Sequence, residues 1–283
     1  MNNHSNKITI GLPVFNGGKY LETAINSLLA QSHEDFELII SDNCSTDETE
    51  IICKKYEKLD CRVIYFKQNE NIGAYKNFLF TLNQAKYEYF MWAAADDEWH
   101  PDFVKSNFLK LTASNKVAVS FCGIECRKIG ENNIQKIDLS KLNNINNKYD
   151  LIRELLTQKK YNFFIYGLFK KNILKQCFSH QCEFIDRWLL LPIALSGYKI
   201  VATEKVFYYR TVYNQKINER HSKSKSKINV GYFALFKSSW NSSNWIENVL
   251  NRKLSLKELC FIKFYSIKFA SYKFLKYIYS TLS

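Results

Sequence analysis

The chain has 283 residues, of which 46% are hydrophobic, and it contains only three prolines and nine glycines. This length and composition allow one large α/β domain with an extension, or two small domains, and they argue against a disordered or repeat protein. The formal net charge of +13 is concentrated late in the sequence, because residues 205–283 carry 15 Lys and Arg against three acids. A basic tail on a nearly neutral body predicts an anionic partner: a membrane, a nucleic acid or a polyanionic substrate.

The eight cysteines form no Cys-x-x-Cys pair, and the N-terminus is polar, without the apolar segment of a secretory signal. Reduced and mostly buried thiols in a cytoplasmic protein are therefore expected. A zinc site is a minor alternative, because the spacings within its candidate ligand pairs are loose. Those candidate ligands are Cys122, Cys126, Cys177 and Cys182.

The first part of the chain alternates between strands and helices. Apolar runs predict buried strands at residues 7–14, 36–41, 62–67 and 87–91. Amphipathic helices are expected at residues 20–31, 75–85 and 102–111, and the capping-box pattern Ser45-x-x-Glu48 predicts a further helix that ends at Lys58. This alternation predicts a mostly parallel sheet with helices on both faces.

Ligands of such sheets bind beyond the carboxyl ends of the strands. The loops expected there are residues 13–18, 41–47, 68–73 and 94–101, where polar residues and glycines are concentrated. The first loop lacks both the G-x-G-x-x-G fingerprint of dinucleotide sites and the lysine followed by Ser or Thr of a P-loop. A nucleotide must therefore be held in another way.

The fourth loop carries three consecutive acids, Asp96, Asp97 and Glu98, just before Pro101 opens a helix. Carboxylates this close repel one another unless a cation lies among them. A hard divalent ion, bound by one or two carboxylates and by substrate phosphates, resolves this repulsion. A solvated acidic turn at a helix N-terminus is the alternative.

Four motifs together resemble the family 2 glycosyltransferases, which are inverting enzymes with the GT-A fold that use nucleotide-diphospho-sugars. The motifs are Gly11–Asn16, Ser41–Asp47, Asn69–Gly73 and Ala95–Pro101. Their order and spacing match across Lys7–Phe103, and more loosely as far as Arg210. The resemblance implies an α/β fold of the GT-A class, with a Rossmann-like, mostly parallel sheet and a helical C-terminal extension.

The resemblance also implies roles for single residues. The implied donor-binding residues are Pro13, Phe15, Asn16, Asp42, Asn71, Gly73 and Asp96. Asp42 would accept the N3–H of uracil, while Asp96 and Asp97 would hold the ribose and, through Mn²⁺ or Mg²⁺, the diphosphate. Ala94 stands where many relatives have another carboxylate, so the sequence leaves open which acid binds the metal directly. It also allows Asp42 to act as a helix-N-terminal acid and Gly73 as an ordinary turn glycine.

Inverting transfer requires a general base on the face of the sugar opposite the diphosphate. Relatives place this base in a Glu-Asp pair at the start of a helix. Here Ile185 replaces the first acid and Asp186 keeps the second, so Asp186 is the predicted base and Glu183 the second candidate. Pairing with Arg187, or capping of the helix, is the alternative role for Asp186.

The predicted organisation is a catalytic domain over residues 1–215 and a basic, aromatic-rich helical extension over residues 216–283. The polar segment 127–147 is expected to be a mobile loop. Lysines among Tyr and Phe favour an interfacial helix on an anionic membrane, although the last segment is too interrupted to span one. Packing on the catalytic domain, or on the second copy of a homodimer, is the alternative.

The sequence therefore predicts an inverting, metal-assisted glycosyltransferase, peripheral on the inner face of the cytoplasmic membrane, with no nucleic-acid partner. It would move a sugar from a UDP-sugar to a hydroxyl of a glycan or lipid-linked acceptor during synthesis of lipopolysaccharide, capsule or a similar polysaccharide. The rival functions are a nucleotidyltransferase and a non-catalytic nucleotide- or membrane-binding protein. The chain lacks the glycine-rich basic loop that a nucleotidyltransferase would be expected to have after its first strand. A non-catalytic binding protein does not explain the four acids Asp42, Asp96, Asp97 and Asp186.

Overall fold

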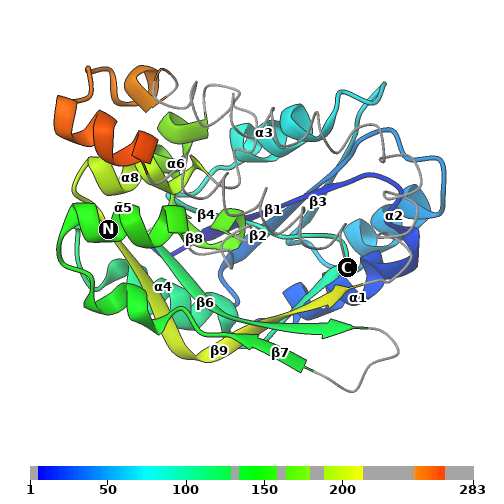
Figure 1. Cartoon of the computed structure of the whole chain (residues 1–283). Helices are drawn as coiled ribbons and strands as arrows, with labels where there is room; N and C mark the ends of the chain where they lie inside the picture. Colours follow the sequence, from blue (N-terminus) through cyan, green and yellow to red (C-terminus); the bar gives the residue numbers. More distant parts are fainter. Residues whose placement is uncertain are drawn as a thin grey trace, which may run out of the picture. The chain divides into compact units, whose positions relative to one another are not determined.

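The computed structural model of the chain describes residues 6–128, 134–157, 164–178, 188–212, 244 and 246–264 (Figure 1). The chain divides into two compact units. Unit 1 consists of Met1–Asn144, Ile165–Phe178 and Lys199–Val212, and unit 2 of Ile145–Phe164, Ser179–Tyr198 and Tyr213–Ser283. The domain boundary at residue 215 stays a prediction.

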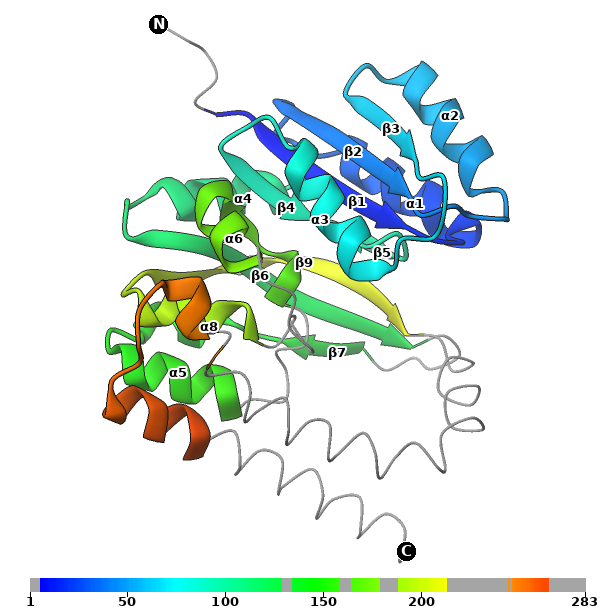
Figure 2. The same ribbon diagram turned by 90° about the horizontal axis from the view of Figure 1, so that it is seen from above.

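Four parallel strands form the first half of the sheet in unit 1. They are β1 (Ile8–Val14), β2 (Phe36–Asp42), β3 (Val63–Lys67) and β4 (Tyr89–Trp92), which lie in the order β3-β2-β1-β4 (Figure 2). Almost every residue of β1 and all residues of β2 and β4 are buried, as expected for strands covered on both faces. The predicted parallel core is confirmed.

Helices cover both faces of these strands. They are α1 (Gly18–Leu29), α2 (Thr49–Leu59) and α3 (Ala74–Gln84). The first two crossovers step from β1 to β2 to β3, whereas the third returns to β4. Because such crossovers are right-handed, α3 lies on the opposite face from α1 and α2 (Figure 2).

The second half of the sheet mixes directions. Its strands are β5 (Asp97–Trp99), β6 (Val117–Lys128), β7 (Ile134–Ile137), β8 (Leu168–Lys170) and β9 (Lys199–Val212). The complete order is β3-β2-β1-β4-β8-β6-β9-β5, with β7 beside β6. β6 and β9 run in the direction of β1–β4, while β5, β7 and β8 run against it, so the predicted mostly parallel α/β fold is confirmed. α4 (Phe103–Thr112) and α6 (Lys171–Phe178) complete this half.

Two loop predictions are wrong. Segment 94–101 contains β5, and segment 127–147 contains the end of β6, β7 and a 3₁₀ helix, Ser140–Asn144. β5 and the 3₁₀ helix depend on partners far along the chain. β5 pairs with β9, and the side-chain amide of Asn143 forms hydrogen bonds with both the N–H and the carbonyl of Ala202, at 2.8 and 2.9 Å. Sequence periodicity does not reveal such partners, because the pairing itself supplies the hydrogen bonds.

The described part of unit 2 is helical. It contains α5 (Lys148–Thr157), α8 (Leu190–Leu195) and helical residues 246–250 and 256–264. Glu258, which is 3% exposed, accepts hydrogen bonds from Arg252 and Lys148, each at 3.0 Å, and Arg252 chiefly lowers the pKa of its carboxyl. Across the described ranges, every helix is too short or too polar to cross a membrane.

Candidate active site

Buried polar side chains link the carboxyl ends of the central strands. Ser41 and Asn77 are 0% and 2% exposed, and the Ser41 hydroxyl donates to Oδ1 of Asn77 at 2.6 Å. The Asn77 amide donates to the carbonyl of Ser41 at 2.9 Å, and Gln68 donates to the Ser41 hydroxyl at 3.0 Å. These bonds fix α3 and the end of β3 against the end of β2. The sequence analysis missed Asn77, although an asparagine on the apolar face of a helix was a usable signal.

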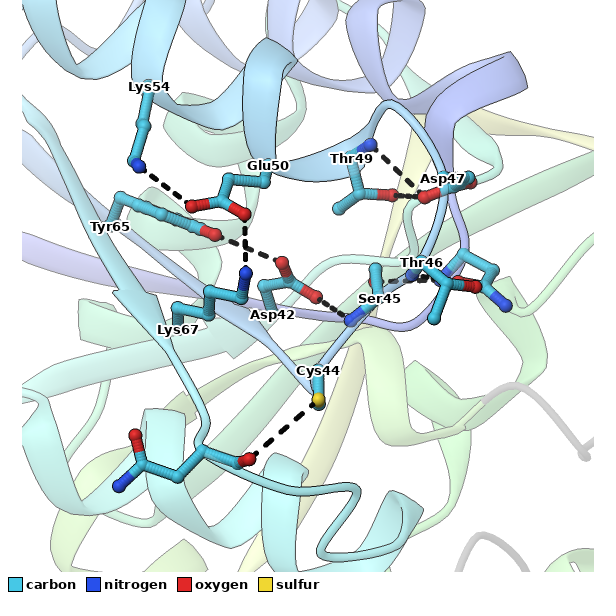
Figure 3. Close-up of polar contacts among 12 residues, drawn as sticks. Asp42, Cys44, Ser45, Thr46, Asp47, Thr49, Glu50, Lys54, Tyr65 and Lys67 are labelled. Carbon is cyan, nitrogen blue, oxygen red and sulfur yellow. Dashed lines mark hydrogen bonds and ion pairs between the residues drawn. The ribbon is translucent and has the colours of Figure 1, made fainter.

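Asp42 lies at the end of β2 and is fully buried. Its Oδ1 accepts the backbone N–H of Ser45 at 2.8 Å, and its Oδ2 accepts the hydroxyl of Tyr65 at 3.0 Å (Figure 3). Burial, and next the bond to Asp42, raise the pKa of Tyr65 well above its ordinary value, so its hydroxyl stays a donor. The Asp42 carboxylate is thus held from two directions, and each of its oxygens accepts one of these bonds.

Asn43 organises the next loop. It is 3% exposed, and its amide donates to Oδ1 of Asn71 at 2.8 Å and accepts the backbone N–H of Ile72 at 2.9 Å. Oδ1 of Asn71 also accepts the N–H of Gly73 at 3.0 Å, and Gly73 has a φ of +82°, which favours glycine. Asn43 was given no role in the sequence analysis, and its position directly after Asp42 was the only signal.

The β1–α1 loop is bonded to the β2–α2 loop. The backbone N–H of Asn16 donates to the hydroxyl of Ser45 at 2.9 Å, and Oδ1 of Asn16 accepts the N–H of Thr46 at 2.9 Å. The predicted capping box is therefore wrong, because Ser45 serves the neighbouring loop and α2 begins at Thr49 without a side-chain cap from Glu48. Phe15 is 50% exposed on this loop, so its ring is accessible to a ligand.

The acid motif lies beside the β1–α1 loop. A methyl group placed at Gly17 would come within 3.5 Å of Cβ of Ala95, the residue before Asp96. Asp96 is partly exposed, whereas Asp97 is 2% exposed and lies on β5, in register with Arg210 of β9. One acid of the pair therefore faces outward and the other belongs to the sheet.

The chain that follows the acid motif is tied to α1. The hydroxyl of Ser27 accepts the N–H of Trp99 at 3.2 Å. Gln31 is 3% exposed; its amide donates to the carbonyl of His100 at 2.8 Å and accepts the N–H of Val104 at 2.9 Å. These bonds fix the direction in which the chain leaves the two acids.

An ion-paired group on the surface of α2 and β3 contrasts with these buried contacts. Glu50 pairs with Lys54 at 2.7 Å and with Lys67 (Figure 3). The hydrogen bonds from Lys54 and Lys67 lower the pKa of Glu50 to about 2. Exposed pairs of this kind contribute little to stability, and we assign this one no part in the site.

Comparison with known proteins identifies the family. The profile described as Glycosyl transferase family 2 matches residues 9–178, more than half of the chain. The chain belongs to glycosyl transferase family 2. The enzyme class expected from the sequence is confirmed at the level of this family.

Curated relatives are bacterial. The putative teichuronic acid biosynthesis glycosyltransferase TuaG of Bacillus subtilis is 34% identical over 125 residues, which cover 44% of this chain and 48% of that protein. A Campylobacter jejuni enzyme, named GalNAc(5)-diNAcBac-PP-undecaprenol beta-1,3-glucosyltransferase, is 27% identical over 82% of this chain and 73% of its own length. Three relatives with 33–34% identity are each matched over less than half of their length.

Solved structures share the fold. The Staphylococcus aureus TarS fragment 1–349 in complex with UDP-GlcNAc has a TM-score of 0.64 at 18% identity, covering 93% of this chain and 71% of that one. The mannosyltransferase PcManGT of Pyrobaculum calidifontis, in complex with GDP-Man and Mn²⁺, has a TM-score of 0.56 at 13% identity, covering 93% and 72%. The predicted GT-A class is confirmed by these likenesses in fold.

In this family 2 chain, the predicted donor-site residues of unit 1 all lie in or beside the loops that follow β1, β2, β3 and β4. They are Pro13, Phe15, Asn16, Asp42, Asn71, Gly73, Asp96 and Asp97. Their roles stay predictions. Asp186, Glu183 and Cys182 lie outside the described residues.

No metal cluster of three or more His, Cys, Asp or Glu side chains occurs within the ranges that the structure describes. The carboxylate oxygens of Asp96 and Asp97 are nevertheless suitable ligands for Mg²⁺ or Mn²⁺. These ions prefer oxygen ligands and are often bound by one or two carboxylates together with substrate phosphates and water. The two acids therefore fit a cation that arrives with a nucleotide diphosphate.

Proposed function

We propose that the chain is an inverting glycosyltransferase that uses a UDP-sugar and Mn²⁺ or Mg²⁺. Its catalytic domain would span residues 1–215. The observation that carries the proposal is the proximity of three loops: the β1–α1 loop is bonded to the β2–α2 loop, and a methyl group added at Gly17 would lie 3.5 Å from Cβ of Ala95, next to the acid pair. Base, ribose and diphosphate of one donor require such neighbouring loops.

In the proposed site, Asp42 recognises the base. An ionised carboxylate only accepts hydrogen bonds, so it matches the N3–H of uracil and disfavours cytosine, whose N3 is an acceptor. The exposed ring of Phe15 offers an apolar surface for the base, and Pro13 and Asn16 complete this side. Gly73, with no atom within 4 Å of an added Cβ, leaves room beside Asn71 for the nucleotide.

Asp96 and Asp97 would hold the ribose and the cation. When bound, the cation neutralises the charge that develops on the leaving UDP. The sheet pairing of β5 fixes Asp97, so this carboxylate needs little reorganisation to bind. Asp96, which is partly exposed, can reach the donor.

Asp186 is proposed as the general base, on the sequence argument alone. It would remove the proton from the acceptor hydroxyl as that oxygen attacks the anomeric carbon. Attack from the face opposite the diphosphate inverts the configuration. Replacement by asparagine keeps the size of the side chain and removes the basic oxygen, so donor binding should survive while transfer is lost.

The acceptor is proposed to be a glycan or lipid-linked hydroxyl in the synthesis of a bacterial surface polysaccharide, such as lipopolysaccharide or capsule. The names of the Bacillus and Campylobacter relatives support this class. Peripheral contact with the anionic inner face of the cytoplasmic membrane is supported by the basic extension 216–283 and by Leu256, 76% exposed beside Lys257. Packing in a homodimer is the alternative for this extension, and no nucleic-acid partner is proposed.

A thermal-shift panel of nucleotide-sugars, with and without Mn²⁺, tests the proposal. A bound donor raises the melting temperature by mass action. We expect a rise with UDP and UDP-sugars that requires Mn²⁺ or Mg²⁺ and is absent in Asp96→Asn. Stabilisation by no UDP compound, or by CDP as strongly as by UDP, would contradict the proposed donor.

A further inference from the structure

Three successive backbone N–H groups lie at the start of α1, those of Asn16, Gly17 and Gly18. Asn16 has a φ of +51°, in the left-handed region, and Gly17 follows in the right-handed region with φ −97° and ψ 0°. This alternation turns successive N–H groups toward one side and forms a nest that attracts anions. A helix N-terminus adds to the attraction, and phosphates are the usual occupants.

Side chains of the β2–α2 loop accept all three N–H groups. The hydroxyl of Ser45 accepts the N–H of Asn16 at 2.9 Å, and the hydroxyl of Thr49 accepts the N–H of Gly17 at 3.0 Å. Oδ2 of Asp47 accepts that of Gly18 at 2.9 Å. The nest is therefore filled from within the chain, and its anion is a carboxylate.

Asp47 also holds the second acceptor in place. Its Oδ1 accepts the hydroxyl of Thr49 at 2.5 Å and the backbone N–H of Thr49 at 3.1 Å (Figure 3). The hydroxyl hydrogen of Thr49 is thus directed at Asp47, which leaves an oxygen lone pair for Gly17. Asp47 is exposed, and its slight desolvation raises the pKa of its carboxyl, but the bonds from Thr49 and Gly18 outweigh this effect and lower the pKa, so the carboxylate is charged at neutral pH.

The glycines of the turn fit this internal contact. A methyl group at Gly18 would lie 3.0 Å from Oδ2 of Asp47 and 2.9 Å from Oε2 of Glu48, and one at Gly17 would lie 2.5 Å from Cγ2 of Val14. A larger residue at either position would therefore displace neighbouring side chains, whether or not a phosphate ever binds. A diphosphate placed at this nest would meet the negative charge of Asp47 and find no free N–H among these three groups.

We propose that Asp47 is a positioning residue for the donor: it fills the nest in place of a phosphate and holds the β1–α1 loop, with Phe15 and Asn16, against the β2–α2 loop. The diphosphate is then left to the cation at Asp96 and Asp97. This inference rests on the proposed function, because it takes the β1–α1 loop as part of the donor site. Thr49 acts in the same way, through Asp47 and Gly17.

The test combines Asp47→Ala with chemical rescue. Loss of a charge-assisted hydrogen bond should raise the exchange rates of the Gly17 and Gly18 amides and the Kd for UDP with Mn²⁺, each about tenfold or more. Formate, a small carboxylate, should restore both, whereas chloride at equal ionic strength should not. Glu48→Gln is the matched control. It removes the same charge one residue away, but it does not remove a side chain that accepts one of the three N–H groups of the nest.

A second pair of variants guards against misfolding. Thr49→Ser keeps the hydroxyl and should behave like the wild-type protein. Thr49→Val, which is close in size, should show the same faster amide exchange and weaker UDP binding as Asp47→Ala. Unchanged exchange and affinity in Asp47→Ala would overturn the inference. So would a loss that formate does not rescue, which would mark a merely structural role. Failure of the unchanged protein to bind UDP would instead contradict the proposed function, and amide exchange with formate would still decide the role of Asp47.

Discussion

The two halves of the sheet in unit 1 are built on contacts of different range. In the β1–β4 half, short βα units follow one another, and the loop after β2 bonds both of its neighbours, through Ser45 to Asn16 and through Asn43 to Asn71. In the β5–β9 half, β5 follows β4 closely in the chain but pairs with β9 at the other edge of the sheet. The acid motif joins the halves, since Ala93 still bonds Gly11 of β1 at 2.9 Å and Asp97 already belongs to β5. The loops after β1 and β2 are thus joined locally, while the position of Asp97 depends on strand pairing across the sheet.

The largest effect is expected at this junction. Asp97→Asn should lower sugar transfer on the order of a thousandfold and abolish the dependence of UDP binding on Mn²⁺, because it removes a ligand charge worth several kcal/mol. Steady-state kinetics and calorimetry across a Mn²⁺ series measure both. Glu98→Gln, the adjacent acid on β5, is the control and should keep both properties. Full metal dependence in Asp97→Asn together with its loss in Asp96→Asn would move the cation to Asp96.

A glycine in each half tests packing. Gly11→Ala should lower the free energy of unfolding by about 1–3 kcal/mol, because the new methyl group would lie 2.7 Å from both Cζ of Phe90 and Oγ1 of Thr81. Gly167→Ala, whose methyl group would lie 2.4 Å from Cε1 of Phe121 in the other half, should cost a similar amount. Urea denaturation measures both. If Gly11→Ala instead kept its stability and lost UDP affinity, this motif glycine would serve the ligand rather than the packing of α3.

A smaller effect is expected at Gly73. Its φ is +82° and an added methyl group would meet nothing within 4 Å, so Gly73→Ala should cost about 1 kcal/mol from backbone strain alone. Gly197, with a φ of +81° and equally open surroundings, is a matched site in unit 2. Both variants should have a slightly lower midpoint urea concentration of unfolding, but only Gly73→Ala should weaken UDP binding. Equal UDP affinities in the two variants would remove Gly73 from the donor site.

The smallest effect concerns pH. The pKa of Asp47 is lowered in the folded chain from its ordinary value of 3.8, so its contribution is complete above that value and is lost as the pH falls through the lowered one. Because the group is exposed, the change in global stability should be slight. NMR should detect a lower protection factor of the Gly18 amide, relative to an unfolded chain at the same pH, with a midpoint below pH 3.8, while amides of β6 and β9 stay protected. Simultaneous loss of protection in both halves would indicate global unfolding instead.

The local half was predictable because each of its elements carries its own signal. Apolar runs predicted β1 and β2, and the 3.6-residue period predicted α1. Of the apolar face expected from that period, Leu21, Ala24, Ile25 and Leu28 are buried, whereas Leu29 is half-buried. The capping-box prediction failed because a hydroxyl can accept any nearby N–H: Ser45 accepts that of Asn16 in the β1–α1 loop, and α2 begins only at Thr49. Local pattern could not reveal this competition between two loops.

The candidate site divides in the same way. The motifs indicated which residues gather at the carboxyl edge of the strands, but not how they are held. That Tyr65 fixes Asp42, or that Asn43 holds Asn71, depends on the ends of two strands, β2 and β3, meeting in register. Tyr65 is half-buried on β3, and nothing in the sequence around it distinguishes it from an ordinary strand residue.

By itself, the sequence determined the parallel core, its helices and the family, and it indicated Asp96 and Asp97 as the proposed cation ligands, because hydrophobic period and motif spacing are properties of neighbouring residues. Only the tertiary structure decided that Asp97 lies in a strand paired with β9 and that Asp47 fills the amide nest of α1. The reason is physical: a hydrogen bond between distant segments forms only after the chain has brought both groups together, and a local pattern does not encode which acceptor will arrive.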